Sequence, residues 1–243
     1  MSKENLPETP IDDLEHDQRD ALAATGRALA GLVPMFGGVV GELVTRTIPE
    51  QRTDRVVRYV RGLNARFDGI EARLQELLTD PNNVDLVEEG GYQSARATSD
   101  ERIQHITALV ANGLDADDAD VIRRKRLARL LGQIDDDELA LLNAYGQSYG
   151  GSNQNPFAAI SRPDPAHLGS GIEEIDAEKL YEAGVEHLLS LGLLTKNYRN
   201  PPRGEAPKFD ARKGDYEHSR EVSYLGRLLL RFIDRPSPID IEK

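Results

Sequence analysis

Apolar residues recur alternately at spacings of four and three over three heptads of this 243-residue chain. This spacing keeps one narrow apolar seam on a single side of a helix. It therefore predicts a long amphipathic helix whose seam packs against other apolar surfaces. The seam residues are Val56, Val60, Leu63, Phe67, Ile70, Leu74 and Leu77.

The composition favours a fold built mainly from helices. Aromatic residues make up 5% of the chain and tryptophan is absent, which suits helices with aliphatic stripes. Forty-two acidic residues against 30 basic ones give a formal net charge of −12, so the surface as a whole repels nucleic acid and anionic lipid. The chain has no cysteine, which excludes disulfides, thiolate zinc sites and a cysteine nucleophile. A reducing compartment follows, and the acidic N-terminal residues lack a signal-peptide pattern, so we expect a cytoplasmic protein.

A second unusual feature is an uncharged stretch of 14 residues from Ala28 to Gly41. A bilayer span needs about 20 residues, and Pro34 interrupts the stretch. Two interpretations stay open: a glycine-rich bend between packed helices, or a concealed membrane-active or oligomerising segment that is released on activation. Under the second interpretation the interface combines the seam with Val33, Phe36, Gly37, Val39, Val40 and Gly41.

Further helices are expected between the seam and residue 146. The pair Gly90-Gly91 is expected to split a short helix from a longer one. Asn112-Gly113 is expected to end a helix that begins near Ser99, because glycine there permits a left-handed cap. One more helix covers 118–134, and Asp135 begins the last.

The C-terminal residues follow the order of a winged-helix domain. A helix ends at Gly192, a strand follows at 193–196, and a polar loop leads to a second strand at 221–223 and a last helix at 225–233. In winged-helix domains such a helix is the recognition helix and such a loop is the wing.

Charge decides what this domain is expected to bind. Arg203, Arg212 and Lys213 give the loop a basic character suited to phosphate, so they are candidate phosphate contacts. The exposed side of the expected recognition helix carries Glu178, Glu182 and Glu186, which repel phosphate. Protein contact is therefore favoured over DNA binding.

These patterns predict a mainly α fold: an N-terminal helical bundle with a long amphipathic helix, followed by a small winged-helix-like α+β C-terminal domain. The expected parts are a disordered acidic arm over 1–20, a helical bundle over 21–146, a linker or loop over 147–172, the winged-helix-like domain over 173–235 and a tail over 236–243.

The sequence contains no GxSxG, P-loop or GxGxxG pattern. Its histidines are scattered without the spacing of a metal motif: they are His16, His105, His167, His187 and His218. Runs of Asp and Glu are typical of a solvated surface. We therefore expect no catalytic residues, no metal, no cofactor and no enzymatic activity.

Three segments carry a resemblance to a known family: GLVPMFGGVVGELV at 31–44, ERIQHITALVANGL at 101–114 and HLLSLGLLTK at 187–196. Across roughly residues 25–235 the architecture resembles that of bacterial abortive-infection proteins of the alpha type and related helical proteins of phage-defence loci. The resemblance implies a non-enzymatic role in cell defence and brings no catalytic residues.

The hypothesis that we prefer is a non-enzymatic helical interaction or oligomerisation protein, acting as an antiviral effector with a concealed membrane-active segment. Its partner would be another protein or a second copy of the chain, and a membrane on activation. The alternative is a winged-helix transcriptional regulator that binds DNA, which the net charge disfavours.

Overall fold

The computed structural model describes residues 50–115, 121–148, 155–160, 162–167, 169–198, 201, 203, 206–211 and 214–241. The chain forms two compact units, Met1–Val121 (unit 1) and Ile122–Lys243 (unit 2). The described residues are mainly helical, and unit 2 adds two small antiparallel hairpins. The expected fold class is confirmed.

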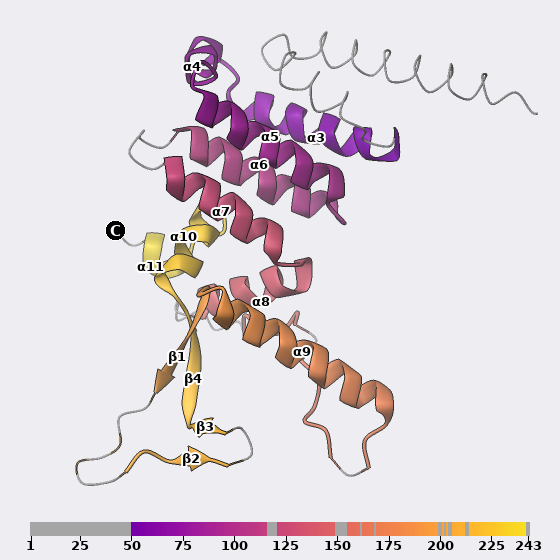
Figure 1. Ribbon diagram of the computed structural model, residues 1–243, viewed down its shortest axis with the longest axis vertical. Helices are drawn as coiled ribbons and strands as arrows, with labels where there is room; N and C mark the ends of the chain where they lie inside the picture. Colours follow the sequence, from indigo (N-terminus) through magenta and orange to yellow (C-terminus); the bar gives the residue numbers. More distant parts are fainter. Residues whose placement is uncertain are drawn as a thin grey trace, which may run out of the picture. The chain divides into compact units, whose positions relative to one another are not determined.

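Unit 1 contains four described helices: α3 (Glu50–Arg66), α4 (Glu71–Leu77), α5 (Pro81–Arg96) and α6 (Asp100–Asp115). Figure 1 shows α3, α5 and α6 side by side, and these three helices pack pairwise against one another. Tyr59 is the buried aromatic residue of these three helices, and its hydroxyl donates a hydrogen bond to the Val87 carbonyl at 2.9 Å.

The long seam helix is broken, which corrects the expectation of a single helix. α3 ends at Arg66 and α4 starts at Glu71, and between them Gly69 takes a φ of +82°. That left-handed conformation suits glycine and is incompatible with a continuing helix. The periodicity persists across the break because Phe67 and Leu74 both return to the core.

Two glycine expectations in unit 1 are also wrong. α5 runs continuously through Gly90-Gly91, and α6 continues through Asn112-Gly113 to Asp115. A Cβ on Gly90 would lie 2.4 Å from the Tyr59 hydroxyl oxygen, so this glycine permits close packing of helices and does not end one. The start of α5 is set by Asp80, which caps the helix by accepting from the Asn82 amide at 2.9 Å.

Unit 2 is built around α8. Its helices are α7 (Val121–Gln133, which begins one residue before the unit), α8 (Asp136–Gln147), α9 (Ile172–Ser190), α10 (Tyr224–Phe232) and α11 (Pro238–Ile241). Its strands are β1 (Leu194–Tyr198), β2 (Phe209–Asp210), β3 (Asp215–Tyr216) and β4 (His218–Val222). α8 contacts α9, α10 and β4.

Strands β1 and β4 form a ribbon at the base of the expected wing loop, and the ribbon and loop are together called the wing below. They pair antiparallel from Leu194 opposite Val222 to Tyr198 opposite His218, and β2 and β3 form a second hairpin in the segment between them. Figure 1 shows this second hairpin beyond the far end of the β1–β4 ribbon. The order α9, β1, β4, α10 is the one expected for a winged-helix-like domain.

The two compact units divide between Val121 and Ile122, and the stretch 147–172, expected as a linker or loop, lies within unit 2. The fold places α8 with the C-terminal elements because it packs against three of them. Part of the intervening stretch is also attached to this unit. Phe157 contacts Tyr145 edge to face with ring centroids 5.0 Å apart, and the Ala166 amide donates to Glu178 Oε2 at 3.1 Å.

Candidate functional site

A cleft between α3 and α6 is the candidate binding site of unit 1. Its volume is about 330 Å³, which is within the range of small-ligand sites. The lining residues come from two helices that lie far apart in sequence: Arg58, Gly62 and Arg66 from α3, and Asp100, Ile103, Gln104 and Thr107 from α6.

The floor of the cleft depends on a glycine. Gly62 faces Thr107, and a Cβ on Gly62 would lie 3.0 Å from Thr107 Cγ2. The missing side chain lets the two helices approach at this point. Thr107 and Ile103 are both buried, and the Thr107 hydroxyl donates to the Ile103 carbonyl at 2.7 Å. The floor is therefore rigid and largely apolar.

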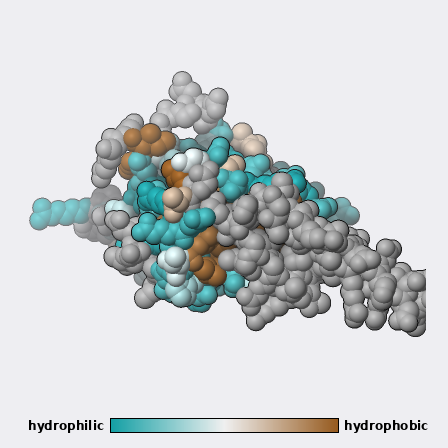
Figure 2. All heavy atoms as spheres, turned by 90° about the horizontal axis from the view of Figure 1, so that it is seen from above, coloured by the Kyte–Doolittle hydropathy of each residue, from teal (hydrophilic) through white to brown (hydrophobic). Residues whose placement is uncertain are grey.

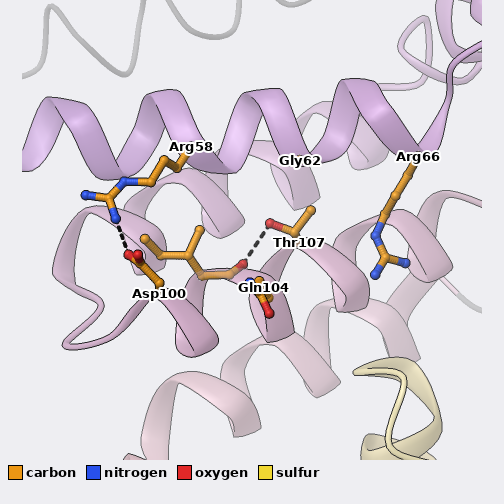
Figure 3. Close-up of a pocket in the computed structure, with 7 residues that line it drawn as sticks. Arg58, Gly62, Arg66, Asp100, Gln104 and Thr107 are labelled. Atoms are coloured by element: carbon orange, nitrogen blue, oxygen red, sulfur yellow. Dashed lines mark hydrogen bonds and ion pairs between the residues drawn. The ribbon is translucent and has the colours of Figure 1, made fainter.

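The rim of the cleft is charged. Figure 3 shows Arg58 and Arg66 extending from α3 toward α6 at opposite ends of the cleft, with Gln104 and Thr107 between them. Arg58 forms an ion pair with Asp100, whose side chain is 71% exposed. With Asp100 engaged at one end, the cleft has a net positive lining in a chain whose net charge is −12.

The predicted seam lies in the core of unit 1. Val56, Val60, Leu63 and Leu74 are at most 1% exposed, and Phe67 is 4% exposed. Leu77 is half-buried and Ile70 is 45% exposed. Most of the seam therefore lies in the core of unit 1, and Leu77 and Ile70 are its partly accessible members.

The other predicted interface residues belong to the uncharged stretch from Ala28 to Gly41. Val33, Phe36, Gly37, Val39, Val40 and Gly41 lie outside the described residues. Among the helices that are described, none is long and apolar enough to cross a membrane. The described residues also contain no group of three or more histidine, aspartate or glutamate side chains that could hold a metal ion.

The wing holds a compact polar cluster around Asp215. Lys196 Nζ contacts Asp215 Oδ2 at 2.9 Å, and the rings of Tyr198 and His218 lie 5.4 Å apart on the same ribbon. The hydrogen bond from Lys196, and then that from the Tyr216 amide, lowers the pKa of Asp215, and the same contact raises the pKa of Lys196. Lys196 is thus engaged within the wing.

The predicted phosphate contacts are only partly described. Arg203 is exposed in a turn between β1 and β2, whereas Arg212 and Lys213 lie outside the described residues. Near the wing tip Phe209 and Tyr216 pack edge to face at 5.4 Å and remain 58% and 48% exposed. The wing therefore presents aromatic as well as basic side chains.

The first half of α9 carries three exposed large apolar side chains among acidic ones. Ile172 is 77% exposed, Leu180 is 75% exposed and Ile175 is 38% exposed. Only Val185 and Leu188, both in the second half, are buried. On the face shown in Figure 2, hydrophilic residues cover most of the described surface, and apolar residues are exposed in small groups.

Sequence analysis missed both the cleft and the α9 surface. The cleft joins Arg66 to Gln104 across 38 positions, and no local pattern signals such a pairing. For α9 a signal was available, because Ile172 and Ile175 lie one turn apart at the start of the helix.

Comparison of this chain with protein-family models, with curated proteins and with solved structures returns no match.

Proposed function

We propose that this protein is a non-enzymatic interaction protein that self-associates through α9. The observation that carries the proposal is the exposure of Ile172, Ile175 and Leu180 on a helix whose first half has no buried residue. A helix in water is held mainly by packing of its apolar side, and large exposed apolar side chains in a group are typical of an interaction surface.

The charge of α9 gives this association a recognisable salt dependence. Its acidic residues are Glu173, Glu174, Asp176, Glu178, Glu182 and Glu186, against one lysine. Two copies of such a helix attract through their apolar side chains and repel through their carboxylates. Added salt screens the repulsion, so association should strengthen as salt rises.

The experiment is light-scattering mass of the full chain over a range of concentration and salt. Leu180→Glu should lower the average mass toward that of a monomer. Ile70→Glu is the matched control, because it makes the same kind of change at an apolar residue that is exposed outside α9. A monomer at every concentration and salt, or an equal effect of both variants, would contradict self-association through α9.

A role in antiviral defence is the wider form of this proposal. It rests on the resemblance to abortive-infection proteins and on the uncharged stretch from Ala28 to Gly41. Self-association would bring several copies of that stretch together at a membrane, which strengthens binding of weak individual anchors.

DNA binding is the second candidate, favoured by the order of α9, β1 and β4 and by the exposed Arg203 and Lys208 in the wing segment. Its weakness is the acidic character of α9, the helix that would enter the major groove. Alanine changes at Arg203, Arg212 and Lys213 should abolish retention of duplex DNA if the wing contacts phosphate. Unchanged retention, or no retention by the unmodified chain, would exclude this role.

A further inference from the structure

We propose that the wing binds single-stranded nucleic acid, with bases stacked on its exposed aromatic rings and phosphates beside its exposed cations. This differs from the duplex DNA binding considered above, in which α9 would enter the major groove. It is also independent of self-association through α9, and its failure would leave that proposal unaffected. It rests on three features of the wing: the exposure of its rings, the contacts that join them and its charge.

Among the described residues of the wing, three large aromatic side chains are exposed. Tyr198 is 48% exposed at the end of β1, and Phe209 and Tyr216 are 58% and 48% exposed on β2 and β3. Phe209 and Tyr216 are opposite each other across the hairpin, edge to face, with ring centroids 5.4 Å apart. In such a pair the faces of at least one ring are not covered by the other. Exposed ring faces of this kind are the surfaces on which unpaired bases stack.

Contacts around Asp215 join Tyr198 to this pair. The Tyr198 hydroxyl lies 3.5 Å from Asp215 Oδ2, and the amide of Tyr216, the next residue, donates to Asp215 Oδ1 at 2.7 Å. The Tyr198 ring also lies 5.4 Å from the ring of His218, its partner across the β1–β4 ribbon. The exposed rings therefore lie in one region of the wing, where successive bases of one strand can reach them.

The charge of the wing is opposite to that of the rest of the chain. Residues 196–221 carry seven basic side chains against five acidic ones, whereas the rest of the chain carries 23 against 37. Arg203 and Lys208 are exposed, and Lys208 directly precedes Phe209. A polyanion is therefore repelled by most of this protein and attracted to the wing. A phosphate held beside Lys208 would bring its own base close to the Phe209 ring.

The carboxylates of the wing favour a flexible strand over a duplex. Asp215 is engaged with Lys196 at 2.9 Å, but Glu217 is exposed beside Tyr216 and repels phosphate. A single strand can turn its phosphates away from Glu217 and its bases toward the rings. A duplex keeps its bases stacked inside the helix and presents two rows of phosphates. A proline-rich peptide could also pack on the rings, but it has no phosphates for Arg203 and Lys208.

The test uses the full chain and fluorescein-labelled probes of about 12 nucleotides, a length within the usual range of single-strand sites. The probes are oligothymidylate, oligouridylate, a DNA duplex and an abasic strand with the same phosphates, and an oligoproline peptide is added for comparison. Fluorescence anisotropy at fixed ionic strength gives the affinities, and amide shifts in ¹⁵N-labelled protein give the location.

We expect saturable binding of a single strand, with the largest shifts at Tyr198, Phe209 and Tyr216. The duplex and the abasic strand should bind at least about tenfold more weakly, because neither offers bases to the rings. Added salt should weaken binding, since phosphate contacts release counterions. The tighter of oligothymidylate and oligouridylate tells DNA from RNA.

Variants separate stacking from general attraction to the wing. Phe209→Leu should weaken binding about tenfold, the usual effect of losing one stacked base. Tyr198→Leu should do the same from the other ribbon, so that an effect of both cannot come from loosening one hairpin. Tyr224→Leu is the matched control, because it removes a ring that is 84% exposed on α10, outside the wing. Lys208→Gln should weaken binding and reduce its salt dependence. All four side chains are exposed, so the fold should survive and circular dichroism verifies it.

Four results would overturn the proposal. The first is no saturable binding of either single strand. The second is an equal loss of affinity in Phe209→Leu and Tyr224→Leu, which would remove the role of the wing rings. The third is an abasic strand or a duplex that binds as tightly as the single strand, which would leave only phosphate contact. The fourth is tighter binding of oligoproline, which would assign the rings to a protein partner.

Discussion

At Gly90 the packing of unit 1 leaves no room for even a methyl group. A Cβ there would lie 2.4 Å from the hydroxyl oxygen of Tyr59 and 2.7 Å from Val110 Cγ2. Both neighbours are fully buried, so neither can move into open space. The absence of a side chain is what allows α5 to approach α3 and α6 together.

We predict that Gly90→Ala destabilises the protein by about 1–3 kcal/mol, the usual cost of overpacking a core. Gly184→Ala is the control: its Cβ would meet Glu138 Cγ at an ordinary 3.4 Å, so stability should hold or rise by up to about 1 kcal/mol. Denaturant unfolding measures both. Equal stability of the two variants would contradict the packing described for Gly90.

Tyr59 makes the stability of unit 1 sensitive to alkali. Burial raises the pKa of its phenol well above the usual 10.0. The folded state therefore holds this proton more tightly than the unfolded state. The resulting contribution of Tyr59 to the free energy of unfolding is complete below pH 10 and is lost as the pH rises past it. We predict a steeper alkaline loss of stability in the unmodified chain than in Tyr59→Phe, measured by thermal unfolding across that range. Parallel pH profiles would show that Tyr59 ionises freely.

At the scale of elements, Glu138 joins the start of α8 to α9. One carboxylate oxygen accepts from the Asp135 amide at 2.9 Å and the other contacts His187 Nδ1 at 2.7 Å. Asp135 in turn accepts from the Glu138 amide at 2.8 Å, completing a capping box. The cap that starts α8 thus also fixes the side chain that meets α9.

We predict that Asp135→Ala lowers the free energy of unfolding by about 1 kcal/mol, because an amide of the first turn loses its acceptor. Asp137→Ala should cost only a few tenths of a kcal/mol, since it removes a charge near the same helix end without removing the cap. Urea unfolding compares the two. If both variants lost the same stability, the charge of the first turn and not the cap would be responsible.

Elements of this fold differ in how far the sequence predicts them. Asp135 before DDELALL and Asp80 before Pro81 mark helix starts by local chemistry, and both helices begin there. Gly69 lies between α3 and α4 with a φ of +82°, whereas Gly90 lies inside α5 against Tyr59. Only the tertiary neighbours distinguish these two roles of glycine.

The candidate site could not be predicted for the same reason. Arg66 lies off the seam, where a charged side chain is expected to face solvent, and Gln104 carries no signal of its own. The cleft exists because Gly62 meets Thr107, a contact between helices that the sequence does not encode locally. The spacing of the seam, in contrast, does mark buried residues, since Val56, Val60, Leu63 and Leu74 are at most 1% exposed.

At the scale of the whole molecule, the predicted membrane-active segment can be tested independently of the fold. We predict that the full chain floats with liposomes and that changing Val39 and Val40 to Asp abolishes flotation, since charge at the apolar segment opposes insertion. Leu180→Glu provides a comparison, because it should reduce binding only if self-association is required. Absence of flotation by the unmodified chain would exclude a constitutive membrane role.

The division of the chain predicts which fragment folds alone. α8 belongs with the C-terminal elements: a Cβ on Gly146 would lie 2.5 Å from Leu230 Cδ1, and Gln147 donates to the Pro236 carbonyl at 3.0 Å. A fragment of residues 122–243 should therefore unfold cooperatively on heating. A fragment of residues 173–243 lacks α8 and should not, because α9, α10 and β4 lose the helix against which they pack.

Calorimetry with far-ultraviolet circular dichroism, applied to both fragments, shows whether the folded unit begins at residue 122 or at residue 173. A cooperative transition in both fragments would mean that the wing and its flanking helices carry a sufficient core of their own, as the sequence alone suggests. A transition in the longer fragment only would mean that Leu142 and its neighbours on α8 supply that core. We expect the second result, because a Cβ on Gly226 would already lie 3.2 Å from Leu142 Cδ1, which places α10 directly against α8.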